Sequence, residues 1–77
     1  MKKRIIKILN DIRPEFDFSS GDDFINQGML DSFDTVRLVV ELDEEFGISI
    51  DGVDIVPDNF KNVDTISRLL IRNGAKP

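Results

Sequence analysis

The apolar residues of this chain recur at helical spacing in three separate stretches. The first is residues 2–13, where four aliphatic side chains follow the i, i+3, i+4, i+7 spacing of one buried helix face. They are Ile5, Ile8, Leu9 and Ile12. Pro14 follows directly and is expected to end the helix, because proline cannot continue it.

The longest periodic stretch is residues 32–46, and Gly47 suits the position just beyond a helix end. On a helical wheel, one arc is apolar and comprises Val36, Leu38, Val39, Leu42 and Phe46. The opposite side comprises Asp34, Arg37, Glu41, Glu44 and Glu45, with Phe33 and Val40 on the border. Such a helix is expected to bury its apolar side and to present an acidic side with an apolar margin to a partner.

A third helix is predicted over residues 63–73, with Asn62 as its N-cap and Gly74 beyond its end. Its buried side comprises Val63, Ile66, Leu69 and Leu70. Residues 75–77 are expected to fray.

Between the second and third helices, only minor elements are expected. Residues 57–61 suit one short helical turn, because Pro57 is favoured at a helix start. Residues 48–50 look extended, but the chain has no second run to pair with them, so no sheet is expected. Residues 51–56 are expected to form a loop or turn.

Residues 14–31 form a connection longer than most loops in compact domains. Its apolar side chains can anchor it over the helices: Phe16, Phe18, Phe24, Ile25, Met29 and Leu30. Ser20 or Asp22 is expected to cap a single turn through Phe24, and Gly28 to allow a backbone turn. The predicted fold is therefore all-α: residues 1–77 form one domain, a small bundle of three main helices plus one short helix, with a long first loop.

Composition and charge restrict the partners. The 77 residues carry a net charge of −5, and the excess of acidic residues lies between Asp31 and Asp58. Such a surface repels nucleic acid and anionic membranes and attracts a basic partner. No stretch has the pattern of a signal peptide or of a bilayer span, so a cytoplasmic location is expected.

Ordinary active-site chemistry finds little support. The chain has no histidine to activate a serine and no cysteine to act as nucleophile or metal ligand. The carboxylates of residues 51–54 lack the spacing of a calcium loop, so no metal site is expected. Ser32, at the start of the second helix, is open to two interpretations: it is the N-cap, or Asp31 caps the helix while Ser32 points outward.

The residues around this junction follow a recognisable order. They are Asp31-Ser32-Phe33, Thr35-Val36, Leu42, Glu44-Glu45-Phe46, Ile48-Ser49-Ile50, Asp54-Ile55-Val56-Pro57, Phe60 and Val63. In this order they resemble the acyl carrier protein family, over essentially the whole chain. The resemblance implies that 4'-phosphopantetheine from coenzyme A is esterified to Ser32, with Asp31 as motif partner, and that the protein is a non-catalytic, monomeric carrier.

The resemblance also implies partners and cargo. A phosphopantetheinyl transferase loads the arm, an adenylating ligase or acyltransferase charges its thiol, and synthases with basic docking surfaces receive the acyl or aminoacyl thioester. The partner-binding residues it implies are Phe33, Asp34, Arg37, Val40, Glu41 and Glu44. Arg37 departs from the family pattern, in which a carboxylate is common at this place, and it suggests partners other than a standard fatty-acid synthase.

Within the family, the cargo stays open between fatty-acid, polyketide, peptidyl and D-alanyl carriers. The alternative from another class is an acidic helical interaction module without a prosthetic group, which would dock a basic partner through exposed Phe33 and Val40.

Overall fold

The computed structural model describes residues 1–77 and contains three α-helices. They are α1 (Lys2–Ile12), α2 (Ser32–Phe46) and α3 (Val63–Arg72), with two short 3-10 turns, η1 (Gly52–Asp54) and η2 (Pro57–Phe60), between α2 and α3. No strand forms. The predicted all-α fold is confirmed; η1 lies in the segment expected to be a loop or turn.

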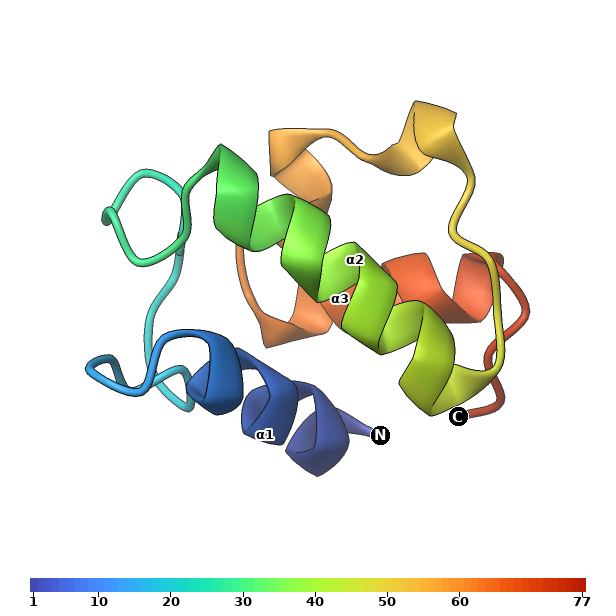
Figure 1. The fold of residues 1–77 in the computed structure, drawn as a ribbon, viewed down its shortest axis with the longest axis horizontal. Helices are drawn as coiled ribbons and strands as arrows, with labels where there is room; N and C mark the ends of the chain where they lie inside the picture. Colours follow the sequence, from blue (N-terminus) through green and yellow to red (C-terminus); the bar gives the residue numbers. More distant parts are fainter.

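The helix α1 holds the bundle together, because it packs against both α2 and α3 (Figure 1). All four of its predicted face residues are buried, and so are three of the four predicted on α3; Val63 is half-buried. Every residue of the buried core is apolar. None of the three helices is both long enough and apolar enough to cross a bilayer.

The predicted buried arc of α2 is wrong at Val36, whose side chain is 64% exposed. Leu38 and Leu42 are fully buried and define the centre of the buried face. Val39 and Phe46 pack at its margin. Val36 lies too far around the helix from that centre to reach the core, because the small bundle covers only a narrow strip of α2.

The long connection is anchored by its aromatic residues, as predicted. Phe18 and Phe24 are each 1% exposed and meet edge to face, with ring centroids 5.0 Å apart. Leu30 is also buried, and Phe16, Ile25 and Met29 pack partly against the core. This packing makes residues 14–31 a part of the domain that leads directly to the start of α2.

The cap of the turn in this connection differs from the prediction. Asp23, and neither Ser20 nor Asp22, accepts the hydrogen bond from the backbone N–H of Asn26, at 3.1 Å. Gly28 follows with a φ of 75°, the left-handed conformation that glycine adopts without strain, and it allows the expected reversal before α2.

The ends of the later elements follow local signals, with one exception. Gly47 ends α2 in the left-handed conformation, and Asn62 caps α3 by accepting from the backbone N–H of Thr65 at 2.9 Å. The expected fraying is wrong at Ala75, which is 6% exposed and donates its N–H to the carbonyl of Leu70 at 2.9 Å. A small apolar side chain that packs on the core holds the chain in place after the helix ends.

Candidate functional site

The start of α2 is closed by a reciprocal cap. The Asp31 carboxylate accepts a hydrogen bond from the backbone N–H of Asp34 at 2.9 Å, and the Asp34 carboxylate accepts from the backbone N–H of Asp31 at 3.1 Å. Two of the backbone donors that a helix leaves unpaired at its start are thereby satisfied. Of the two sequence interpretations, the one in which Asp31 is the cap is correct.

Ser32 is the first residue of α2 and is exposed. Its hydroxyl takes no part in the cap, because Asp31 and Asp34 make the capping hydrogen bonds. The positive end of the helix dipole lies beside it, and this end favours an attached phosphate group. The geometry therefore offers a free hydroxyl in a place suited to a phosphodiester.

Asp34 does not lie on the open acidic side, where the helical wheel placed it. Its side chain is only 14% exposed, and its carboxylate lies 3.0 Å from Arg13 Nη1. Arg13 follows the last residue of α1, and the same Nη1 atom lies 4.0 Å from the Asp31 carboxylate. The expectation was wrong because a cation from another element covers that side of the first turn.

The environment of the cap lowers the pKa of the Asp31 carboxyl below its usual 3.8. The largest cause is the hydrogen bond from the Asp34 backbone N–H; burial opposes it, and the Phe33 backbone N–H, the Arg13 charge and the Asp34 side chain add to the lowering. All of these favourable contacts prefer the ionised carboxylate.

This lowered pKa predicts how the stability of the protein depends on pH. Because the pKa of Asp31 in the folded protein lies below 3.8, its ionised form stabilises the fold above that pH, and the contribution is lost as the pH falls through the lowered pKa. Asn is also a good cap, so Asp31→Asn removes the charge and keeps the cap. We expect the thermal midpoint of the wild type to exceed that of Asp31→Asn near neutral pH, and the difference to shrink in acid. If the difference in thermal midpoint stays constant from neutral to acidic pH, the lowered pKa of Asp31 is contradicted.

An apolar groove of about 360 Å³ opens beside Ser32. Its walls come from two segments that are distant in sequence: the end of the long connection with the first turns of α2 that follow it, and the chain at the start of η2. The lining residues are Ile25, Leu30, Asp31, Ser32, Thr35, Val36, Ile55, Val56 and Pro57. Of these lining residues, only Asp31 and Ser32 were predicted as site residues from the sequence. The signal that could have pointed to more of the lining is that Thr35-Val36 and Ile55-Val56-Pro57 belong to the order of residues that resembles the carrier family.

The other predicted site residues lie along the exposed side of α2. Phe33 is 87% exposed and Val40 is 52% exposed, so both are free for contact. Arg37 pairs with Glu41 at 3.6 Å, one helical turn apart; the Glu41 side chain is only 35% exposed and its Oε2 atom is buried, whereas Glu44 is exposed. Phe33 is the residue next to Ser32 in α2, whereas Val40, Glu41 and Glu44 lie about two turns or more farther along the helix.

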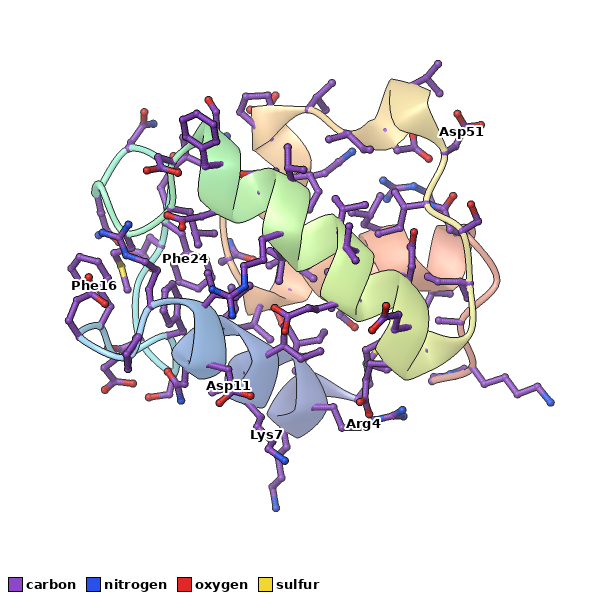
Figure 2. All side chains as sticks on the ribbon, viewed as in Figure 1. Arg4, Lys7, Asp11, Phe16, Phe24 and Asp51 are labelled. Atoms are coloured by element: carbon purple, nitrogen blue, oxygen red, sulfur yellow. The ribbon has the colours of Figure 1, made fainter.

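Basic residues of α1 face the acidic residues of α2 across a polar groove of about 380 Å³. Figure 2 shows Arg4, Lys7 and Asp11 in a row along α1. Arg4 reaches across to Glu45, with 2.7 Å between Nε and Oε2. Nowhere in the structure do three or more acidic, histidine or cysteine side chains gather closely enough to hold one metal ion.

Comparison with known proteins agrees with this site. The family described as "phosphopantetheine attachment site" matches residues 3–70. The D-alanyl carrier protein of Leuconostoc mesenteroides subsp. mesenteroides is 44% identical over 50 residues, which cover 62% of this chain and 63% of the relative. The chain thus matches less than two thirds of the length of that curated relative.

The family match extends from α1 to the last turns of α3, so it includes the exposed hydroxyl, the cap and the apolar groove. The groove and the helix dipole suit the apolar and anionic parts of a phosphopantetheine arm. Covalently attached phosphopantetheine is the cofactor of this protein. The chain belongs to the family of phosphopantetheine-binding carrier proteins.

Proposed function

We propose that Ser32 bears the 4'-phosphopantetheine arm and that the protein carries acyl or aminoacyl groups as thioesters between enzymes, without catalysing a reaction itself. The observation that supports this most directly is that Asp31 supplies the helix cap, so the exposed Ser32 hydroxyl has no structural task. The arm supplies the thiol, and the chain itself has no cysteine.

The experiment that tests this proposal is the intact mass of the protein after incubation with coenzyme A, Mg²⁺ and a promiscuous phosphopantetheinyl transferase. A gain of one phosphopantetheine group per chain, mapped to the peptide that contains Ser32, is the expected result. A mass gain mapped to another residue, or no gain at all, contradicts the proposal.

The partner surface that we propose runs from the hydroxyl along α2. Phe33 and Val40 supply exposed apolar contact, and Glu41 and Glu44 supply negative charge for a basic transferase, ligase or synthase. Arg37 adds a positive charge through its pair with Glu41 and so alters the charge pattern that a partner meets. Asp34 has a smaller direct part, because Arg13 already covers its carboxylate.

We favour an aminoacyl cargo charged by an adenylating ligase. The support for this choice is the similarity to a protein named as a D-alanyl carrier, together with the non-acidic Arg37 on the exposed side of α2. The purified holo-protein, offered D-alanine, ATP and a D-alanine-activating ligase, is then expected to gain the mass of one alanyl group.

The alternative of an interaction module without a prosthetic group finds no support, because the family carries a phosphopantetheine attachment site.

Charge reversal on α2 should slow loading without unfolding the protein. In Glu41→Lys with Glu44→Lys, the attraction to a basic transferase is lost, and we expect loading to slow by about tenfold at low salt. The thermal midpoint should fall by little, because Glu44 is exposed and the Arg37–Glu41 pair, with side chains 58% and 35% exposed, contributes little to stability. The measurement is the rate of mass gain at several salt concentrations.

A matched pair of single variants controls for net charge. Glu44→Lys and the exposed Asp22→Lys change the net charge equally, but Asp22 lies in the long connection, away from the proposed surface. Only Glu44→Lys should slow loading. If both variants and the wild type are loaded at equal rates, α2 does not steer the transferase to the protein.

A further inference from the structure

Arg13 gathers three carboxylates from two elements at the start of α2. Its Nη1 atom lies 3.0 Å from Asp34 Oδ2 and 4.0 Å from Asp31 Oδ2. Its Nε atom lies 3.1 Å from Glu15 Oε2, without the alignment of a hydrogen bond. The guanidinium also lies over the Phe16 ring, 5.3 Å from its centroid. These contacts hold the side chain in one place, with only 28% of it exposed.

Both halves of the helix cap are therefore tied to the end of α1. Asp31 and Asp34 flank Ser32 in sequence and make the two reciprocal capping bonds. A cap made of two carboxylates places like charges together, and this arrangement is unfavourable unless a cation lies beside them. Arg13 is that cation, and its planar fork suits carboxylates better than an ammonium group does.

The opposite end of α2 has a similar link between the two helices, which makes a useful comparison. Arg4 bridges to Glu45 at 2.7 Å and donates to its backbone carbonyl at 2.8 Å, but the two side chains are 51% and 43% exposed, and both contacts lie in the last turn of α2. The link through Arg13 is more enclosed, since the Asp34 side chain is 14% exposed. The two arginines thus join the same two helices, and only Arg13 acts on the turn that holds Ser32.

We propose that Arg13 is a positioning residue for the modification of Ser32, since it holds the Asp31–Asp34 cap in place and thereby fixes the first turn of α2. This inference rests on the proposed attachment of the arm at Ser32. Arg13 also keeps the Asp34 carboxylate from the basic surface of a partner. These two effects of Arg13 act in opposite directions on loading. Fixing the first turn orients the Ser32 hydroxyl and favours loading, whereas covering the Asp34 carboxylate weakens the attraction to a basic transferase.

The two effects predict a distinct kinetic signature. In Arg13→Gln, the first turn loosens, so the hydroxyl is less often in the reactive orientation and kcat for loading should fall by about tenfold. The freed carboxylates of Asp31 and Asp34 strengthen docking to a basic transferase, so KM should stay equal or fall. A purely structural role moves neither constant at a temperature at which both proteins are folded.

The matched control is Arg4→Gln, which cuts the other link between α1 and α2. It should load with the kcat of the wild type, although it loses a comparable ion pair. Hydrogen exchange supplies a second readout: the backbone N–H groups of Asp34 and Thr35, bonded to Asp31 at 2.9 and 3.0 Å, should exchange faster in Arg13→Gln and not in Arg4→Gln.

Two further variants test the route through the cap. Arg13→Lys keeps the charge but loses the fork, so its kcat should lie between those of the wild type and Arg13→Gln. In an Asp34→Asn background, Arg13→Gln should have a much smaller effect, because the pair of like charges that Arg13 holds together is gone and its closest ion pair is already lost. A full tenfold effect of Arg13→Gln in that background contradicts the proposed route.

The outcomes separate this inference from the proposed function. If the wild type gains the arm at Ser32 and Arg13→Gln loads with an unchanged kcat, the positioning role is wrong and the carrier function stands. If the wild type gains no arm at Ser32, the proposed function itself fails. Equal losses of kcat in Arg13→Gln and Arg4→Gln assign the effect to general stability and also overturn the positioning role.

Discussion

Ser32→Ala is expected to gain no phosphopantetheine under conditions in which the wild type is fully loaded. The substitution removes the oxygen that forms the bond to the phosphate of the arm, and no neighbouring hydroxyl can take its place at the start of α2. Thr35 lies three residues on, but its hydroxyl donates to the Asp31 carbonyl at 3.0 Å within the helix. The measurement is intact mass after incubation with coenzyme A, Mg²⁺ and a promiscuous transferase.

The loss should be chemical and not structural. Asp31 caps the helix, and Ser32 is exposed, so we expect Ser32→Ala to change the free energy of unfolding by no more than about 0.5 kcal/mol. The matched control is Ser49→Ala, which removes an exposed serine hydroxyl from the segment after α2 and should load like the wild type. If Ser32→Ala gains phosphopantetheine at the same rate as Ser49→Ala, Ser32 is not the attachment site.

Phe24→Ala is expected to give the largest loss of stability. The Phe24 ring is 1% exposed and packs edge to face against Phe18, so truncation removes buried apolar surface and leaves a cavity. Such substitutions cost about 3–5 kcal/mol. A small domain has a total stability of about 5–15 kcal/mol, so this variant loses a large share of it. Urea or thermal unfolding followed by circular dichroism measures the change.

Phe33→Ala is the matched control for Phe24→Ala, because it truncates the same type of side chain at an exposed position. The Phe33 ring is 87% exposed, so the free energy of unfolding should stay within about 0.5 kcal/mol of the wild type. We expect loading by the transferase to slow in this variant, because the exposed ring flanks Ser32 and belongs to the proposed partner surface. Equal destabilisation by the two alanine variants contradicts the packing described for the long connection.

The position of Phe24 also links stability to the site. Its carbonyl accepts hydrogen bonds from the N–H groups of Met29 and Leu30, at 2.9 and 3.2 Å, directly before the Asp31 cap. Its own N–H donates to the carbonyl of Lys61, just before α3. The residue therefore joins the two segments that approach the start of α2 and of α3. Loss of its ring should loosen the approach to Ser32 before the whole domain unfolds.

Much of the fold could be predicted from the sequence, because its signals are local. The spacing of Ile5, Ile8, Leu9 and Ile12 defines the buried face of α1 wherever that helix lies. Asn62 and Gly47 mark helix ends through hydrogen bonds and backbone angles within a few residues. The order of residues from Asp31 onward was enough to indicate the carrier family, which the family match then showed.

The features that the sequence did not reveal depend on residues far apart in the chain. Val36 is exposed because the bundle covers only a narrow strip of α2, and Ala75 is buried because the chain after α3 folds back on the core. The groove beside Ser32 needs the long connection, α2 and the chain around η2 to meet. Sequence periodicity gives the direction of each side chain on its own helix and carries no information on which neighbour covers it.

The start of α2 shows both contributions at once. The sequence by itself determined that a helix begins at the Asp31–Ser32 junction, because capping residues and helical periodicity are local signals, but it left the cap open between these two residues. The structure decided that Asp31 is the cap and Ser32 the first helical residue. Only the tertiary structure decided that the Asp34 carboxylate is covered, because Arg13 reaches it from a position 21 residues earlier. An ion pair of this kind depends on how α1 packs against α2, and this packing is a property of the assembled core.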